Sequence, residues 1–297
     1  DMTLSNLLIE ELDLSQINFN GNTLTLQCKQ LNKIVGSETF NGSLFLLPKD
    51  CRLTEFTLEG ISNIQGDFQC IDYFYVKEFV MPFIRVAGDM TIALNSGSVN
   101  TAAEIEFPKL QEIGGTLTLG TNRNANNITF PLLKKILGSC SVTTYKLKND
   151  IEFTNLESIG TDGADAQIKF EIEATNILCP KLKTINGKFD IATSSFMFDM
   201  EVDKVSYPNV ESISENLSIT CPYSDFGSNG ILSIDFSGLK SAKGISISGQ
   251  GDVTDFSSFK YLFENNVLTG ESQWSVKECG YNPTFQEMKD GKYKLAE

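Results

Sequence analysis

The chain has 297 residues, of which 41% are apolar, so it can bury a continuous core and does not have the composition of a disordered chain. Its 38 acidic and 24 basic residues give a formal net charge of −14, which disfavours nucleic acid and anionic lipid as partners. The absence of histidine excludes Ser-His and Cys-His nucleophilic sites, and no stretch reaches the roughly 18 apolar residues of a membrane-spanning segment.

The first twenty residues carry only a blurred apolar pattern. We expect residues 1–20 to form an N-terminal cap over a solenoid whose coils occupy residues 21–276, with a C-terminal cap over residues 277–297. Residues 1–297 are then one solenoid domain. The chain begins at Asp1, which fits a processed or trimmed chain and leaves open whether a signal peptide or lipobox preceded it.

A strand-sized motif recurs from residue 21 onward, as Gly-Asn-Thr-Leu-Thr-Leu at 21–26 and Gly-Gly-Thr-Leu-Thr-Leu at 114–119. It contains an apolar-x-apolar pair, and residues two apart share one face of a strand. The eleven pairs, spaced 20 to 29 residues apart, are Leu24/Leu26, Leu44/Leu46, Phe68/Cys70, Met90/Ile92, Leu117/Leu119, Cys140/Val142, Ala166/Ile168, Phe189/Ile191, Leu217/Ile219, Ile245/Ile247 and Trp274/Val276. Such a repeat indicates one structural unit stacked on copies of itself.

A second register follows in the middle of the chain, exemplified by Ile105-x-Phe107-Pro108 and then Leu110 and Ile113. Proline cannot donate to a sheet ladder, so it ends this strand and turns the chain. Equivalent strands of successive coils should pair in parallel at about 4.8 Å. The pattern therefore predicts an all-β fold, a right-handed parallel β-helix of about 10–11 irregular coils of 20–29 residues, closed by a short C-terminal helix.

The residue between the two members of each apolar pair is polar in every coil except at Phe45. This alternation predicts one buried and one solvated strand face. We expect the outward residues to form a row along the stack, which is either a binding face for a protein or glycan or simply a solvated sheet surface. The row consists of Thr91, Thr118, Ser141, Gln167, Asp190, Ser218 and Ser246.

Loops and helices are expected where the coil pattern is interrupted. Segments rich in Asn, Ser, Gly and Asp predict surface loops near residues 96–103, 121–127, 161–165, 194–203 and 222–230. A short helix is expected within residues 255–264. A second helix should start with Asn282 as N-cap and Pro283 in its first turn, and end at Gly291.

The unit Phe-Pro-x-Leu-x-x-Ile-x-Gly-x-Leu-x-Leu at residues 107–119 resembles the coil of the receptor L domain, the leucine-rich-repeat-like β-helix of insulin and epidermal growth factor receptor ectodomains. The resemblance is best over residues 79–250. It implies a non-enzymatic surface binding or adhesion module that is secreted or surface-anchored, such as a bacterial surface lipoprotein, with a protein or glycan partner and no cofactor. The motif carries no catalytic residue.

Two other functions remain open, a carbohydrate-active β-helix enzyme (a polysaccharide lyase or hydrolase) and a purely structural spacer. An enzyme would draw on carboxylate pairs such as Asp162 with Asp165 or Glu104 with Glu106, although the first pair fits a turn and the second a solvated strand face. The alternating carboxylates in residues 199–203 could supply oxygens to calcium but lack the glycine turn of a calcium loop. We expect no catalytic residue and no metal site.

Aromatic and cysteine residues have functional and structural interpretations. Three consecutive aromatic residues at 73–75 and two at 196 and 198 could stack on sugar rings or mark an interface, and Phe196 and Phe198 could instead fill a widened coil. Trp274, Cys70 and Cys140 occupy inward positions of the repeat, so we expect all three to be buried in the core.

Overall fold

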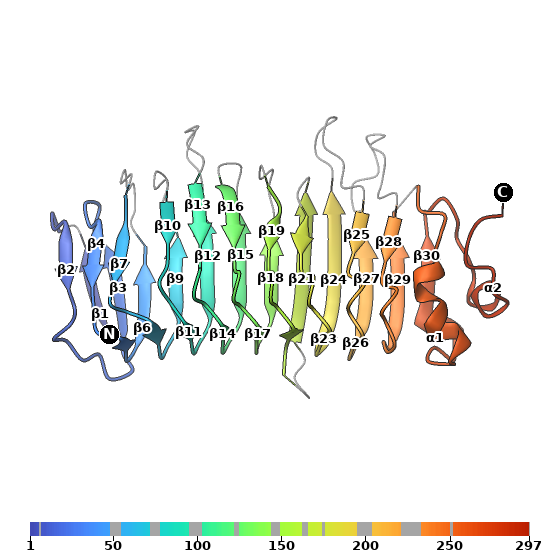
Figure 1. Ribbon diagram of the computed structural model, residues 1–297, viewed down its shortest axis with the longest axis horizontal. Coiled ribbons are helices and arrows are strands. Elements are labelled where there is room, and N and C mark those ends of the chain that lie inside the picture. Colours follow the sequence, from blue (N-terminus) through green and yellow to red (C-terminus); the bar gives the residue numbers. More distant parts are fainter. Residues whose placement is uncertain are drawn as a thin grey trace.

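The computed structural model describes residues 1–5, 7–47, 55–71, 78–94, 103–121, 125–143, 149–161, 166–173, 176–194, 204–220, 233–249 and 252–296. Over these residues the chain is an elongated parallel β-solenoid with its two termini at opposite ends (Figure 1). The predicted all-β class and parallel solenoid are thereby confirmed. The predicted loops fall mainly on residues outside the described ranges, although parts of the segment 121–127 belong to strands.

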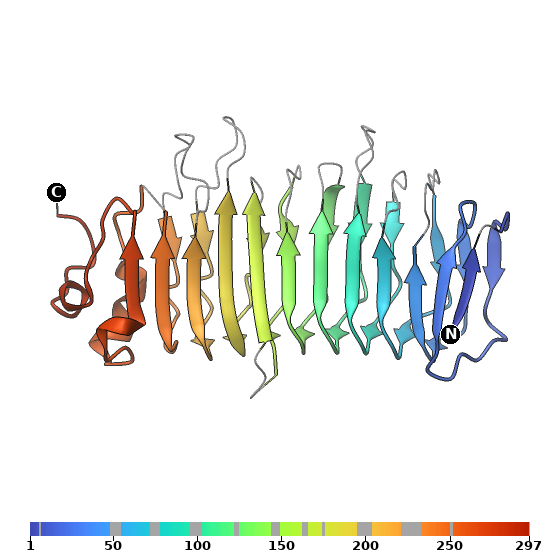
Figure 2. The ribbon, with the colours of Figure 1, turned by 180° about the vertical axis from the view of Figure 1, so that it is seen from behind.

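One sheet, called here the long sheet, receives a strand from every coil and runs the length of the stack (Figure 2). Its twelve strands, all paired in parallel, are β1 (Met2–Ser5), β3 (Thr23–Gln27), β6 (Ser43–Leu46), β9 (Phe68–Ile71), β12 (Met90–Leu94), β15 (Leu117–Thr121), β18 (Cys140–Thr143), β21 (Ala166–Glu173), β24 (Gly187–Ser194), β27 (Asn216–Thr220), β29 (Gly244–Ser248) and β30 (Trp274–Lys277). The expected N-terminal cap thus contributes a strand of its own, since β1 pairs with β3.

The opposite side of the coil, called here the second face, is divided into three parallel sheets. They are β2 (Glu11–Asp13), β4 (Lys33–Val35) and β7 (Thr57–Glu59); then β10 (Glu78–Val80), β13 (Ala103–Glu106), β16 (Ala125–Thr129), β19 (Ile151–Glu152) and β22 (Ile177–Leu178); and last β25 (Lys204–Ser206) and β28 (Ser233–Asp235). The predicted second register lies on this face, because Ile105 belongs to β13 and Phe107 and Pro108 follow it directly.

A fifth sheet, made of two-residue strands, lies at the corner where each coil returns to the long sheet. Its strands are β5 (Thr39–Phe40), β8 (Asn63–Ile64), β11 (Arg85–Val86), β14 (Glu112–Ile113), β17 (Lys135–Ile136), β20 (Ser158–Ile159), β23 (Thr184–Ile185) and β26 (Ser212–Ile213). Eight successive coils therefore hold three strands each, from β3–β5 to β24–β26. The flanking coils have fewer strands, so the predicted 10–11 units consist of eight complete coils and partial ones.

Aromatic rings stack along the interior at the end of the second-face strands. Phe107, Phe130 and Phe153 are fully buried, with successive centroids 4.8 and 4.9 Å apart and interplanar angles of 0° and 9°. This separation matches the spacing of parallel strands, about 4.8 Å. Each coil therefore covers the ring of the coil before it, and the apolar interior is continuous along the stack.

A column of glycines allows the coils to approach closely where the chain enters the long sheet. The N–H groups of Gly66, Gly88, Gly115 and Gly138 each donate to the carbonyl of the preceding glycine, beginning at Gly42, over 2.9 to 3.0 Å. A Cβ atom on Gly115 would lie 2.7 Å from the carbonyl carbon of Gly88. Close backbone approach therefore requires glycine at this position.

Alternating charges mark the next turn of the stack, in a set of five residues that we call the charge column. Lys134, Glu157, Lys183, Glu211 and Lys240 occupy equivalent positions in successive coils, since each backbone N–H donates to the carbonyl of the preceding member over 2.8 to 3.0 Å. Nζ of Lys240 also donates to Oε2 of Glu211 over 2.8 Å. Chiefly through this hydrogen bond, the pKa of Glu211 is lowered and that of Lys240 is raised.

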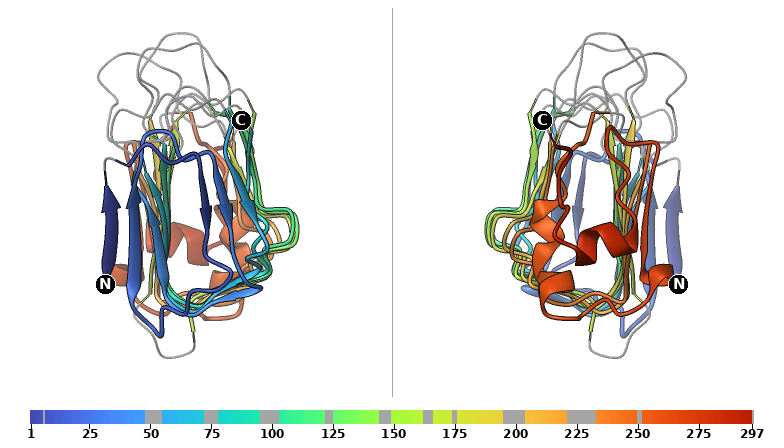
Figure 3. Two further views of the ribbon diagram at one scale, coloured as in Figure 1. Left: turned by 90° about the vertical axis from the view of Figure 1, so that its left-hand side faces the viewer. Right: turned by 90° about the vertical axis from the view of Figure 1, so that its right-hand side faces the viewer.

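Helical segments cover the C-terminal end of the solenoid (Figure 3). They are η2 (Ser257–Phe259), α1 (Lys260–Glu264), η3 (Glu271–Gln273) and α2 (Phe285–Lys289). Trp274 is buried among them and donates from Nε1 to the carbonyl of Pro283 over 2.9 Å. Both predicted helices therefore exist, and together with Trp274 they close the last coil.

The start of α2 differs from the prediction. Its N-cap is Thr284, whose hydroxyl accepts from the N–H of Glu287, while the Glu287 carboxylate accepts from the N–H of Thr284 over 2.9 Å. Asn282 instead accepts a hydrogen bond from the N–H of Cys279. A capping box satisfies two backbone donors at once, which explains why the helix begins two residues later than expected.

Candidate functional site

Six of the seven predicted binding residues lie in one straight row on the outward side of the long sheet. The parallel register places Thr91 beside Thr118 and Thr118 beside Ser141. Farther along, the same row contains Asp190, Ser218 and Ser246 as successive neighbours. The sheet therefore brings together side chains that are more than 20 residues apart in the sequence.

Gln167 was wrongly placed in this row. The residue between Ser141 and Asp190 is Lys169, while Gln167 pairs with Lys188. The eight-residue strand β21 alternates apolar and polar residues throughout, so its inward pair could be assigned two residues too early. The inward residues in register with Cys140 and Val142 are therefore Ile168 and Phe170 rather than Ala166 and Ile168.

Lys169 divides the row into two chemically different parts. Around it lie Lys188 and Asp190, whose Nζ and Oδ2 atoms are 3.0 Å apart. On its N-terminal side the row holds only hydroxyl groups from β12 to β18. We call Thr91, Thr118 and Ser141, together with Ala93, Gly120 and Thr143 of the adjoining row, the hydroxyl face.

The hydroxyl face is open at its centre, near Gly120. Thr118 is exposed, whereas Thr91 and Ser141 are half-buried. Among the described residues, no atom beyond the chain neighbours of Gly120 would lie within 4 Å of a Cβ placed on it. Hydroxyls can both donate and accept, so this face can form hydrogen bonds with partners of either polarity while offering no steric barrier.

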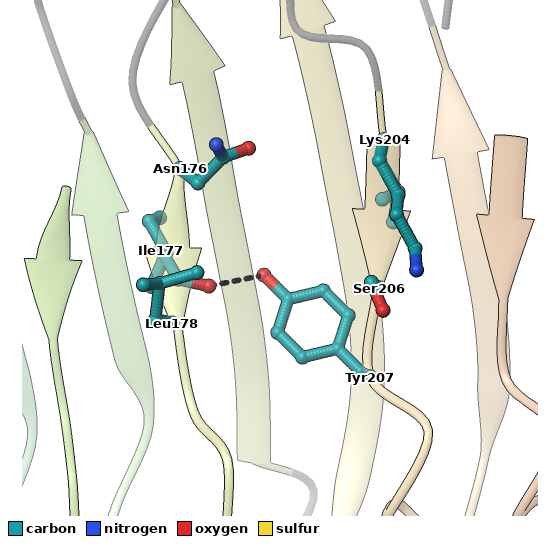
Figure 4. A pocket seen from close by; sticks show the side chains of 7 residues that line it. Asn176, Ile177, Leu178, Lys204, Ser206 and Tyr207 are labelled. Carbon is teal, nitrogen blue, oxygen red and sulfur yellow. Dashed lines mark hydrogen bonds between the residues drawn. The ribbon is translucent and has the colours of Figure 1, made fainter. Parts of the chain in front are cut away.

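A second feature is a local breach in the second face. Strands β22 and β25 belong to different sheets, although the same two coils pair through β21 and β24 and through β23 and β26. The breach encloses a cavity of about 120 Å³ lined by Asn176, Ile177, Leu178, Lys204, Val205, Ser206 and Tyr207 (Figure 4). The two coils are therefore separated on the second face only, and they remain paired in the long sheet and in the corner sheet.

Residue substitutions within the repeat accompany the breach. Cys179 occupies the position that phenylalanine fills at 107, 130 and 153, so the aromatic stack stops there. The Tyr207 hydroxyl of the next coil donates to the Ile177 carbonyl over 3.1 Å, and Figure 4 shows its ring between the two strands. Burial raises the pKa of Tyr207 well above its ordinary value, so the hydroxyl stays protonated as a donor.

The carboxylates considered for catalysis do not form a described site. Glu104 lies on β13 beside Glu78 of β10, and its Oε2 accepts from Nδ2 of Asn127 over 2.8 Å. Glu106 lies two residues farther along the same strand, so both fit a solvated sheet surface. No group of three or more Cys, Asp or Glu residues in the described ranges is arranged to hold a metal. Residues 73–75, 162, 165, 196–198, 199, 201 and 203 lie outside the described residues.

The inward cysteines and the tryptophan belong to the core. Cys70 and Cys140 are completely buried and Trp274 is 5% exposed, as expected from their positions in the repeat. Burial raises the pKa of the Cys140 and Cys179 thiols, so neither has the character of a reactive thiolate. These side chains therefore support the stack rather than a surface site.

Comparison of the chain with protein-family models, curated proteins and solved structures finds no match. The resemblance to the receptor L domain therefore rests on the coil motif alone. Among the helices in the described part of the chain, none is long and apolar enough to cross a bilayer.

Proposed function

We propose that this protein is a non-enzymatic binding or adhesion module that recognises a protein or glycan through its hydroxyl face. The observation that carries the proposal is the in-register row of Thr91, Thr118 and Ser141 beside the open backbone at Gly120. An enzyme would need reactive groups that converge in a cleft. The described carboxylates Glu104 and Glu106 instead lie side by side on one face of a strand.

The geometry of the row suits an extended partner. Parallel strands repeat at about 4.8 Å, so hydroxyls recur at that interval along the stack. The strands fix these side chains on a rigid surface before binding, which lowers the entropic cost of association. A polymer lying along the stack can contact several coils at once, so weak single contacts add through effective concentration.

A location outside the cytoplasm, either secreted or surface-anchored as in a lipoprotein, is part of the same proposal. It is supported by the coil motif that resembles the receptor L domain. Fractionation of cells that express the full-length protein, with surface labelling, tests it. Recovery only in the cytoplasmic fraction would refute this part.

A pair of glycine variants tests the binding face. Gly120→Arg adds a long side chain to the centre of the hydroxyl face, where the described residues leave the space around its Cβ open. Gly270→Arg is the matched control, because the nearest described atom beyond its chain neighbours would lie 3.9 Å from its Cβ and it directly precedes η3, away from the hydroxyl face. Both changes leave the inward ladder intact.

The measurement is binding of the purified protein to glycan and surface-protein arrays, followed by titration of each hit. We expect at least one hit whose affinity falls tenfold or more in Gly120→Arg and stays unchanged in Gly270→Arg. Equal affinity in both variants would exclude the hydroxyl face. Absence of any hit would favour a structural spacer, and new reducing or unsaturated ends on a polysaccharide hit would favour an enzyme.

A further inference from the structure

The breach in the second face presents two strand edges to each other. Strand β22 pairs with β19 on one edge, and β25 pairs with β28 on one edge. The remaining edges face the cavity, and Tyr207 reaches across it to Ile177. An unpaired strand edge is a template for another main chain, and in the described part of the chain neither of these two edges pairs with a further strand.

The size and lining of the cavity favour a slim occupant. Its volume of about 120 Å³ is well below the roughly 300–1,000 Å³ typical of pockets for drug-sized ligands. The side chains at its mouth are the amide of Asn176, the hydroxyl of Ser206 and the 38% exposed Leu178. A main chain with small side chains fits these limits better than a sugar ring or a helix.

The charges beside the breach are mostly negative. Glu152 is the parallel neighbour of Leu178, and Asp235 is the parallel neighbour of Ser206. Asp150 lies nearby, since its carboxylate accepts from the N–H of Asn176. Lys204 is the one basic residue among the described lining residues, and its Nζ is 3.7 Å from Oδ2 of Asp235. Outward side chains of an occupant would therefore meet carboxylates on both sides.

We propose that the breach binds an extended basic peptide as an added strand between β22 and β25. Its main chain would pair with both edges, its Lys or Arg side chains would face Glu152 and Asp235, and small residues would face the interior above Tyr207. The Tyr207 hydroxyl would release the Ile177 carbonyl, which then accepts an N–H of the peptide. This site is separate from the hydroxyl face, so it does not depend on the proposed function.

The probe is the acetylated and amidated peptide Lys-Ala-Lys-Ala-Lys, titrated into the full chain at low salt by calorimetry. Its two controls are Glu-Ala-Glu-Ala-Glu, which reverses the charge, and the Lys peptide with N-methylated alanines, which keeps the charge but loses main-chain donors. We expect measurable binding of the Lys peptide, at least tenfold weaker binding of both controls, and slower amide exchange at residues 176–178 and 204–206.

Two variants sharpen the test. Tyr207→Phe removes the hydroxyl that competes for the Ile177 carbonyl, so we expect it to bind the Lys peptide two- to tenfold more tightly. If that variant does not fold, Glu152→Gln, on the exposed surface, should weaken binding by about two- to fivefold, while Gly120→Arg should leave it unchanged. Equal binding of the N-methylated peptide, the absence of binding, or protection of these strands by self-association instead of peptide would overturn the proposal.

Discussion

The rings of Phe107 and Phe130 stack with an interplanar angle of 0° and a centroid distance of 4.8 Å, although 23 residues separate them in the sequence. This arrangement links the packing of three successive coils, because the ring of Phe130 is covered by Phe107 on one side and by Phe153 on the other. Removal of one ring should therefore weaken the packing of the neighbouring coils as well.

Phe130→Ala should lower the free energy of unfolding by about 3–5 kcal/mol, the range for removing a fully buried phenylalanine. Urea denaturation followed by circular dichroism measures this change. Phe45→Ala is the control, because Phe45 lies on the outward side of the long sheet and is only half-buried. A similar loss in the two variants would show that the buried stack contributes nothing beyond ordinary apolar contact.

Gly115→Ala should destabilise the protein by more than about 2 kcal/mol, because its Cβ would lie 2.7 Å from the carbonyl carbon of Gly88 and the coils would have to separate. Gly120→Ala on the open face should be neutral or slightly stabilising, since alanine loses less backbone entropy than glycine. Thermal unfolding of the two variants compares them directly. Equal melting temperatures would contradict the requirement for close approach at Gly115.

The ion pair of Glu211 and Lys240 should make stability depend on pH in a defined direction. The folded-state pKa of Glu211 is lowered from its ordinary value of 4.5, so its contribution is present above that value and is lost as the pH falls through the lowered pKa. We expect Glu211→Gln to melt at a lower temperature than the wild type at pH 7.

This difference should disappear as the solution is acidified, and it should shrink in high salt because both side chains are exposed. Melting curves of the two proteins between pH 7 and pH 3 provide the measurement. A difference that persists unchanged at the acid end would mean that Glu211 acts through packing rather than charge.

Cys140 and Cys179 should resist alkylation in the folded protein at pH 8, because burial raises the pKa of both thiols and blocks access to them. Both should react quickly in guanidinium chloride. Pulse labelling with iodoacetamide followed by peptide mass spectrometry separates these two sites from the other cysteines. Rapid native-state labelling of either site would show that the coils open locally around β18 or β22.

The repeat itself was the part of the fold most accessible from sequence. Period-2 alternation fixes which side chains point inward, and ten of the eleven inward pairs fall at equivalent positions of the long sheet. The exception is the pair Ala166/Ile168, which was assigned two residues too early along β21. Because this eight-residue strand alternates over its whole length, a shift of two residues keeps the same side chains on the inward face. The same shift affects the outward row. Its other members are correctly predicted, but the residue that β21 contributes to the row is Lys169 and not Gln167.

The breach could not be derived from the repeat. The stretch Ile177-x-Cys179-Pro180 has the same pattern as its neighbours, and its one signal is a cysteine in place of a phenylalanine. Whether two strands pair depends on the packing between coils, which a single-coil pattern does not contain. The N-cap at Thr284 shows a related limit, because Asn282 and Thr284 are both good caps and only the reciprocal bond with Glu287 decides between them.

The charge column makes neighbouring coils chemically different, which the apolar repeat does not. Every coil presents nearly interchangeable Leu, Ile and Phe ladders, so the interior alone would accept a stack from which one coil had looped out. Omission of the coil that holds Lys183 would bring Glu157 beside Glu211, and omission of the next would bring Lys183 beside Lys240. Like charges at adjacent positions repel. Between residues 134 and 240, neighbouring coils are thereby distinguished by the sign of one exposed charge, which disfavours pairing between coils that are two apart in the chain.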